Sequence, residues 1–269
     1  MQILPIVIVA CLRDEARLQT LLASLEKFSV ETRQIHVVSG DLDFDTFAKA
    51  WHCRLRPTAA RHCYWLHPAH ELATITSTVG WRRQQVLKLL AYKLLDGDWL
   101  TMDCSNLVTR PWSNSDLSIN GQWVTTGDSP DNLGNHAFID AIRYYMAWFD
   151  CRPTMVESCC TPFVLEAGVV GQLIERFNGE SRFVEWFVSS DFNPSEYCLH
   201  SIFSQSLRPF NRCRRRTGFY VWQPGGCTAD QLRAAFDNDR YKTITVHRAA
   251  LEDHNLRLAY DQCVANLNL

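Results

Sequence analysis

The sequence predicts an α/β fold of three layers, in which helices cover both faces of a central, mostly parallel β-sheet. Three observations predict this fold. The chain opens with a strand, a helix and a second strand, short apolar runs recur along it, and helical patterns separate most of these runs. A β-α-β opening favours parallel strands joined by a right-handed crossover.

The opening strand is expected over residues 3–10, a continuous apolar run rich in β-branched residues. Such a run is typical of a strand that is buried on both faces. Leucines then recur at helical spacing after Arg13 and Asp14, and Asp14 stands where an N-cap is expected. A second strand is expected over residues 34–40, where the apolar run ends at a turn.

Further elements follow from the same patterns. Strands are expected over residues 61–67, 99–102, 122–126, 162–165, 218–223 and 243–247. Helices are expected over residues 80–95, 166–177, 194–206 and 249–267. Residues 113–136 are rich in Ser, Asn, Asp and Gly, which predicts a long loop in this region.

Composition narrows the class of protein. The chain has 269 residues, of which 46% are hydrophobic and 21% charged, values that suit a globular domain with a sizeable core. The formal net charge of −2 gives no support to nucleic acid as a partner. The run from Arg212 to Arg216 is basic and could meet phosphates or an anionic acceptor, but such a run is more often a solvated loop, which we expect here.

The 11 cysteines are scattered, and no CxxC spacing occurs. The N-terminal segment has no basic region or cleavage site of a signal peptide, and its apolar run is too short to span a bilayer. We therefore expect free thiols, no transmembrane segment and a cytoplasmic location.

The most informative segment joins a polar helix face to an acidic turn. Trp81, Gln84, Gln85 and Lys88 share one face of the helix expected over residues 80–95. The strand that follows delivers Asp103 at its carboxyl end, where ligands bind in open α/β sheets. Helix and turn are therefore expected to lie together at one site.

These residues resemble a known class of enzyme. The Asp-containing turn after a strand resembles the DxD element of GT-A nucleotide-sugar glycosyltransferases. The Gly-Trp-x-x-Gln-Gln-x-x-Lys-Leu helix resembles that of a sparsely characterised GT-A-like family of bacterial and phage proteins. The likeness is close over residues 80–106 and follows the order of elements over residues 3–250.

The resemblance implies a GT-A-like, Rossmann-like fold in a single catalytic domain over residues 1–269. It implies a nucleotide-binding half over roughly 1–112, an acceptor half over 113–248 and a C-terminal helix over 249–269. The implied reaction moves a hexose or pentose from a nucleotide-diphosphate sugar to an acceptor hydroxyl. The acceptor is expected to be a glycan; a modified base of phage DNA is the alternative, and the near-neutral net charge of the chain favours it less.

In the resembled enzymes the acidic turn holds a divalent cation, Mn2+ or Mg2+, which binds the donor diphosphate. Asp103 is the expected ligand. His247, at the end of the strand 243–247, resembles the late histidine that completes many such sites. The turn departs from DxD because Ser105 stands where the second acidic residue is expected, so a weak metal site and a metal-independent site are both open.

The resemblance also assigns residues to the donor. Lys88 is expected beside the phosphates, with Gln84 and Gln85 on the same helix face and Asn106 in the turn. Arg13 and Asp14 follow the first strand, where GT-A enzymes meet the base and ribose. Each residue also has an ordinary explanation, since a polar helix face is usually solvated and Asp14 suits an N-cap.

Glu196 is the candidate general base, because the resembled family has an acidic residue in a Ser-Glu-Tyr context near the acceptor. Asp191 is the second choice. A competing interpretation is a capping box, with Asn193 at the N-cap and Glu196 at the third helical position. The base is needed only if the enzyme inverts the anomeric configuration.

Two other classes of protein stay open. A nucleotidyltransferase would need a glycine-rich phosphate loop after the first strand, and residues 10–14 contain no glycine. A non-catalytic nucleotide- or glycan-binding module on a decayed GT-A fold is consistent with the incomplete acidic turn.

Overall fold

The computed structural model describes residues 2–41, 43–52, 61–73, 80–134, 136–157, 160–209, 212–214 and 218–269. Its main sheet has five strands in the order β10-β4-β1-β2-β3. They are β1 (Ile6–Ala10), β2 (Gln34–Ser39), β3 (Cys63–His67), β4 (Trp99–Met102) and β10 (Phe163–Leu165). Strands β4, β1, β2 and β3 are parallel neighbours, and only β10 runs antiparallel. The predicted central, mostly parallel sheet is confirmed.

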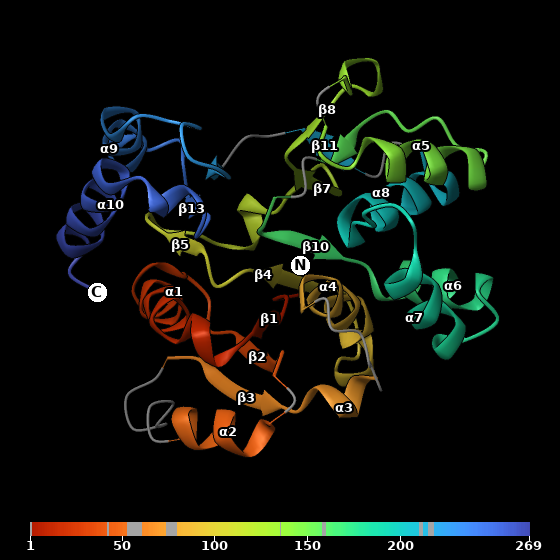
Figure 1. Ribbon diagram of the computed structural model, residues 1–269, viewed down its shortest axis with the longest axis horizontal. Coiled ribbons are helices and arrows are strands. Elements are labelled where there is room, and N and C mark those ends of the chain that lie inside the picture. Colours follow the sequence, from red (N-terminus) through yellow and green to blue (C-terminus); the bar gives the residue numbers. More distant parts are fainter. Residues whose placement is uncertain are drawn as a thin grey trace.

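Strand β1 is buried on both faces, as its continuous apolar run predicts. Val7 and Val9 belong to a core shared with α4 (Gly80–Leu90), α6 (Ala167–Arg176), α7 (Glu180–Ser189) and α8 (Glu196–Leu207). Ile6 and Ile8 belong to a second core with α1 (Glu15–Phe28) and α2 (Phe44–His52). Because successive strand residues point to opposite faces, the alternation builds three layers, α/β/α (Figure 1).

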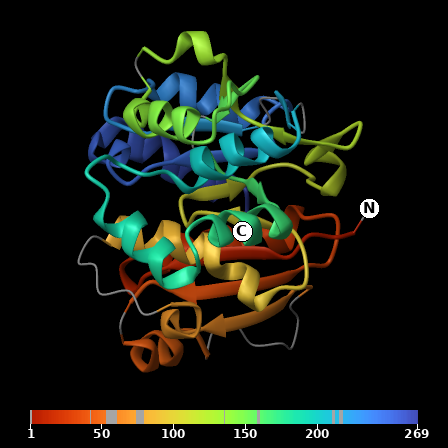
Figure 2. The same cartoon turned by 90° about the vertical axis from the view of Figure 1, so that its right-hand side faces the viewer.

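A smaller sheet adjoins the turn after β4. Strand β13 (Thr243–Val246) lies between β12 (Gly218–Val221), to which it is parallel, and β5 (Asn106–Val108), to which it is antiparallel. Helices α9 (Ala229–Asp237) and α10 (His254–Asn266) pack on it around a third apolar cluster. In Figures 1 and 2 this C-terminal part, in blue, lies above the N-terminal strands, in red and orange.

The predicted loop over residues 113–136 contains short strands, β6 (Ser118–Ile119), β7 (Gln122–Thr125) and β8 (Gly127–Asp128). Strand β11 (Arg212–Arg214) pairs with β7, and β9 (Val156–Glu157) pairs with β8. Five of the described α-helices were not predicted from the sequence: α2, α3 (Ala69–Leu72), α5 (Ile139–Trp148), α7 and α9. Helix α9 carried a readable signal, because Thr228 and Gln231 form a capping box at its start.

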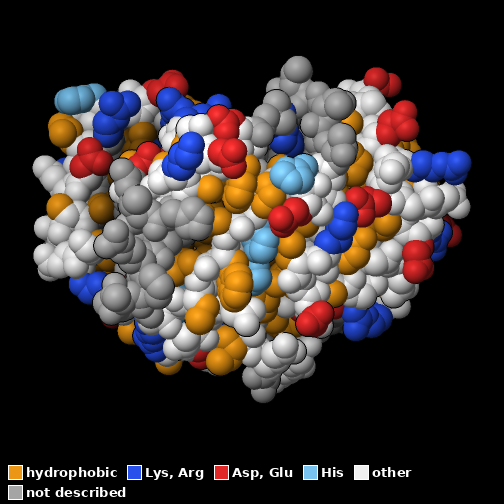
Figure 3. Space-filling model, turned by 90° about the horizontal axis from the view of Figure 1, so that it is seen from below, with side chains coloured by type: hydrophobic (Ala, Val, Ile, Leu, Met, Phe, Trp, Pro, Cys, Tyr) orange, Lys and Arg blue, Asp and Glu red, His pale blue; other side chains and the backbone are white. Residues whose placement is uncertain are grey.

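Helix α3 (Ala69–Leu72) follows β3, which lies at one edge of the main sheet. Trp65 of β3 is 53% exposed, and its ring lies 6.4 Å from that of His36. The view from below shows hydrophobic and histidine side chains gathered in the middle of this face (Figure 3).

Two sequence expectations concern thiols and membranes. Among the nine cysteines at described positions, none forms a disulfide with another. Within the described ranges, no helix is both long enough and apolar enough to cross a bilayer.

The expected solvated loop at Arg212 is wrong for this residue, which lies in β11 and is 4% exposed. Its Nη2 donates to the carbonyl of Val164 and lies 3.5 Å from Oε2 of Glu166. His200 Nε2 accepts from the backbone N–H of Glu166, and Ser204 donates to the Glu166 carboxylate. We call Glu166, His200, Ser204 and Arg212 the core cluster. Counter-charges supplied by Glu157 and Glu166, both far away in sequence, explain why this arginine is buried.

Candidate active site

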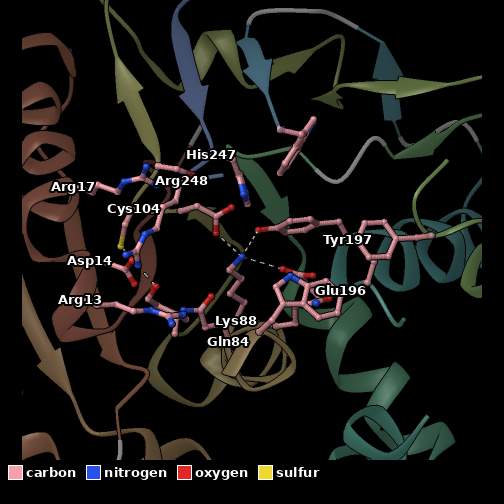
Figure 4. Close-up of a pocket in the computed structure, with 18 residues that line it drawn as sticks. Arg13, Asp14, Arg17, Gln84, Lys88, Cys104, Glu196, Tyr197, His247 and Arg248 are labelled. Atoms are coloured by element: carbon pink, nitrogen blue, oxygen red, sulfur yellow. Dashed lines mark hydrogen bonds and ion pairs between the residues drawn. The ribbon is translucent and has the colours of Figure 1, made fainter. Parts of the chain in front are cut away.

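One pocket lies at the carboxyl ends of β1 and β4, as the predicted topology requires. Its volume is about 330 Å3, within the range of small-molecule sites. Loops after β1, β4 and β13 line it together with α4 and the start of α8 (Figure 4). The lining residues are Val9, Arg13, Asp14, Arg17, Trp81, Gln84, Gln85, Lys88, Asp103, Cys104, Ser105, Phe138, Ser195, Glu196, Tyr197, Trp222, His247 and Arg248.

Lys88 is the centre of this pocket. Its Nζ lies 2.6 Å from Asp103 Oδ1, 3.0 Å from Glu196 Oε1 and 2.9 Å from the Tyr197 hydroxyl. Lys88, Glu196 and Tyr197 are each 5% exposed or less. We call Lys88, Asp103, Glu196 and Tyr197 the pocket cluster. Two carboxylates therefore share one buried ammonium group.

The cluster sets the charge of its members. Burial alone would raise the pKa of Asp103, but the Lys88 ammonium outweighs it and holds this pKa below its ordinary value. Burial likewise opposes charge on Lys88, yet Asp103, Tyr197 and Glu196 raise the pKa of the lysine well above its usual range. Burial raises the pKa of Glu196, Lys88 opposes this, and the neighbouring charge of Asp103 adds to it.

Helix α4 supplies the predicted polar face. Gln84 lines the pocket, and its Nε2 lies 3.7 Å from Cys11 Sγ. Gln85 is buried, and its Oε1 accepts the backbone N–H of Glu196 at 3.0 Å. Gln85 thus fixes the start of α8 relative to α4, which places Glu196 beside Lys88.

The capping-box interpretation of Glu196 is wrong. Helix α8 begins at Glu196, and Ser195 is the N-cap, with its hydroxyl accepting the N–H of Cys198 at 3.3 Å. Glu196 is the first helical residue, so its carboxylate is free of the cap and turns to Lys88. A capping role no longer competes for this side chain.

Basic residues line the opposite side of the pocket. Arg13 and Asp14 lie in the short helical turn between β1 and α1, Arg17 lies one turn further, and Arg248 follows β13. Asp14 stands at the predicted N-cap, but its carboxylate accepts the N–H of Cys11 and does not cap α1. Figure 4 places these residues on one side of Lys88 and Glu196 and Tyr197 on the other.

His247 points into the pocket, and its ring centroid lies 4.6 Å from that of Trp222. Burial lowers the pKa of His247 although Asp103 opposes this, so the imidazole is neutral at pH 7.

A neutral imidazole and one carboxylate are competent metal ligands. Asp103, however, already bonds Lys88 at Oδ1 and accepts from Thr161 at Oδ2. No group of three His, Cys, Asp or Glu in the described part of the chain is arranged to hold a metal ion. With Asp103 already paired to Lys88, this donor set does not fit a divalent cation.

Two predicted residues lie elsewhere. Asn106 is 2% exposed and does not line the pocket; its Oδ1 accepts the N–H of Asp103, and its Nδ2 donates to Thr245. Asn106 therefore holds the acidic turn through its hydrogen bond to Asp103 and is too buried to contact a nucleotide-sugar donor. Asp191 is exposed and also lies outside the pocket lining.

Sequence reasoning missed several lining residues: Arg17, Phe138, Tyr197, Trp222 and Arg248. Arg17 carried a signal, since it lies four residues after Arg13 and so shares its helix face. Tyr197 and Arg248 directly follow Glu196 and His247. Phe138 stacks on Trp81 at 5.7 Å, a contact between distant segments that no local pattern shows.

Comparison with solved structures identifies the architecture. The chain is similar to the galactosyltransferase LgtC solved with donor and acceptor sugar analogs (TM-score 0.54, 14% identity, 99% of this chain and 97% of that chain covered). It is similar to the bifunctional glycosyltransferase WbbM (TM-score 0.53, 11% identity, 98% and 50% covered). It is also similar to mouse xyloside xylosyltransferase 1 (TM-score 0.50, 10% identity, 90% and 97% covered). The fold is therefore that of the GT-A glycosyltransferases.

At the level of sequence, the chain belongs to a family of unknown function, DUF6492, whose model matches residues 1–221. No curated protein matches the chain at a significant level.

Proposed function

We propose that this protein is a glycosyltransferase that moves a sugar from a nucleotide-diphosphate sugar to an acceptor hydroxyl. The observation that carries the proposal is the pocket cluster, in which Asp103, at the end of β4, and Glu196, at the start of α8, meet at Lys88 inside a cavity. The GT-A fold supports the same reaction class, because the similar solved structures are glycosyltransferases.

The pocket suggests how a donor lies in it. Arg13, Arg17 and Arg248 favour the nucleotide and phosphates on one side, because guanidinium groups pair well with phosphate oxygens. The transferred sugar then lies towards Lys88 and Asp103. Trp81 and Trp222, 40% and 39% exposed, offer flat apolar faces at the pocket for a base or a sugar ring.

The acceptor is expected on the side of Glu196 and Tyr197. In an inverting reaction the acceptor oxygen attacks the anomeric carbon, its proton passes to the Glu196 carboxylate, and the bond to the nucleoside diphosphate breaks. Burial and the nearby charge of Asp103 raise the pKa of Glu196, which favours a base that works near neutral pH. Lys88 holds this carboxylate in place through a bond of 3.0 Å.

A screen of nucleotide sugars for hydrolysis and for transfer to a set of glycans tests the proposal. We expect one donor to be consumed by the wild-type protein and not by Asp103→Asn. The rival interpretation, a non-catalytic binding module, predicts binding of a nucleotide sugar without turnover. Turnover of a nucleoside triphosphate with release of pyrophosphate would instead indicate a nucleotidyltransferase.

A further inference from the structure

We infer that the pocket binds the diphosphate of its donor without a divalent metal, with the Lys88 ammonium in the cation's place beside Asp103 and with Arg17 and Arg248 as the phosphate clamp. This inference rests on the proposed function of the pocket. It names the chemistry by which the leaving diphosphate is recognised.

The first observation is the state of Asp103. Its Oδ1 lies 2.6 Å from Lys88 Nζ, and its Oδ2 accepts from the Thr161 hydroxyl at 3.2 Å. Cys104 and Ser105, the next two residues of the turn, add no second carboxylate. A divalent ion at this carboxylate would have to lie against an ammonium group, and like charges at that range repel strongly in a buried site. The lysine therefore supplies the positive charge that the acidic turn attracts.

The second observation is that Lys88 is held firmly. Besides Asp103 it contacts Glu196 and the Tyr197 hydroxyl, and its Nζ lies 5.0 Å from the centre of the Tyr197 ring. Only 6% of its side chain is exposed. To make room for a metal, the ammonium would have to leave two carboxylates and an aromatic face and enter solvent.

The third observation concerns the arginines on the opposite side. Within the described ranges neither Arg17 nor Arg248 forms an ion pair with a carboxylate, although both line the pocket. Burial lowers the pKa of Arg17, the nearby Asp14 carboxylate opposes this, and the Arg248 guanidinium adds to it. Arg33 and Arg110, by contrast, each lie 3.0 Å from a carboxylate oxygen. Two guanidinium groups that face one cavity, with Asp14 nearby but with no described carboxylate in an ion pair with either of them, form a site suited to a polyanion.

Together these groups match a nucleoside diphosphate. Guanidinium groups bind phosphate oxygens through paired, charge-assisted hydrogen bonds. Charge that develops on the leaving diphosphate is stabilised by fixed cations in a site that excludes water. Arg17 and Arg248 lie on one side of Lys88, with Glu196 and Tyr197 on the other (Figure 4). In the inferred complex the two arginines bind the phosphates, and Lys88 lies towards the bond that breaks.

The experiment measures the binding of UDP, GDP, ADP, CDP and dTDP to the full chain by calorimetry, first with EDTA and then with Mn2+. We expect one diphosphate to bind with the same Kd, within about twofold, under both conditions. Arg17→Gln and Arg248→Gln should each weaken it at least about tenfold. Arg182→Gln, an exposed arginine of α7 outside the pocket, is the matched control and should leave Kd unchanged.

Three results would overturn the inference, and they separate it from the proposed function. In the first, EDTA abolishes binding, Mn2+ restores it, and His247→Ala changes the Mn2+ concentration that is required. This result would show a metal site and would leave the glycosyltransferase proposal intact. In the second, a diphosphate binds in the presence of EDTA, but neither Arg17→Gln nor Arg248→Gln weakens its binding. This result would exclude these two arginines as the phosphate clamp. If no diphosphate binds under either condition, the proposed function fails as well. Arg248 is exposed, so its variant tests the clamp even if Arg17→Gln does not fold.

Discussion

Helix α8 carries two charged clusters, and they differ in what surrounds them. The pocket cluster lies at its first turn, where Glu196 and Tyr197 meet Lys88. The core cluster lies further along, where His200 and Ser204 contact Glu166. Glu196 and Glu166 are almost equally buried, at 3% and 6% exposed, and each pairs with a basic residue from another element.

The difference is access. Every member of the pocket cluster lines the cavity, whereas no member of the core cluster does. Burial, ion pairing and perturbed ionisation therefore do not by themselves mark a functional site in this protein, because both clusters show them. The cavity distinguishes the cluster that can meet a substrate from the cluster that holds helix and sheet together.

The largest effect is expected at Asp103. Asp103→Asn removes the charge that positions Lys88, while the amide can still accept a hydrogen bond. We expect donor turnover to fall about a thousandfold, or about 4 kcal/mol in activation free energy, with an unchanged circular dichroism spectrum. Turnover at the wild-type rate would remove the pocket cluster from the reaction.

Glu166→Gln is the counterpart in the core cluster. It removes the carboxylate that pairs with both Arg208 and Arg212 and leaves Glu157 as the main counter-charge of Arg212. We expect the free energy of unfolding to fall by about 3 kcal/mol. Urea denaturation measures this loss. Because Glu166 does not reach the pocket, turnover per folded molecule should stay near the wild-type value. A proportionate loss of turnover in the folded protein would show that the two clusters are coupled along α8.

Glu196→Gln tests the pocket cluster from the other side. The glutamine can accept from Lys88 but cannot take a proton usefully at neutral pH. We expect turnover to fall at least about a hundredfold, about 2.7 kcal/mol, with a near-normal melting temperature. If turnover survives, the reaction proceeds without a base at this position, as a retaining transfer would.

Ser195→Ala is the matched control for that variant. It removes the cap of α8 and leaves the Glu196 carboxylate in place. It should lower the free energy of unfolding by about 1 kcal/mol, measured by denaturation. A stability loss of the same size in Glu196→Gln would instead report the lost ion pair between Glu196 and Lys88, because glutamine can replace glutamate in a helix cap.

The core cluster also makes the stability of the protein depend on pH. Burial, and then the charge of Arg212, hold the pKa of His200 well below its ordinary value. In the unfolded chain this histidine therefore binds a proton as pH falls through about 6.5, whereas in the folded protein it stays neutral to a lower pH. The stability that this group contributes is present above about pH 6.5 and is lost as pH falls further. We expect a slope of at most about 1.4 kcal/mol per pH unit, which His200→Gln reduces in denaturation series between pH 7 and 5. An unchanged slope in the variant would assign the loss to other groups.

The sequence determined the local elements well. Apolar runs located the strands of the parallel core, and helical spacing located α1, α4, α6 and α8. The rule that ligands bind at the carboxyl ends of parallel strands then placed Asp103 in the pocket together with Arg13, Gln84 and Lys88. These inferences succeed because side-chain periodicity and strand order are properties of neighbouring residues.

Only the tertiary structure decided how the charged side chains pair. The Lys88–Asp103 contact spans 15 residues and was within reach of local reasoning, but the Lys88–Glu196 contact spans 108. From sequence alone, Glu196 could be a general base or a capping-box partner of Asn193. The basic run that contains Arg212 likewise had the pattern of a solvated loop. The energy of a charged group depends on burial and on partners brought together by the fold, and no window of sequence contains them.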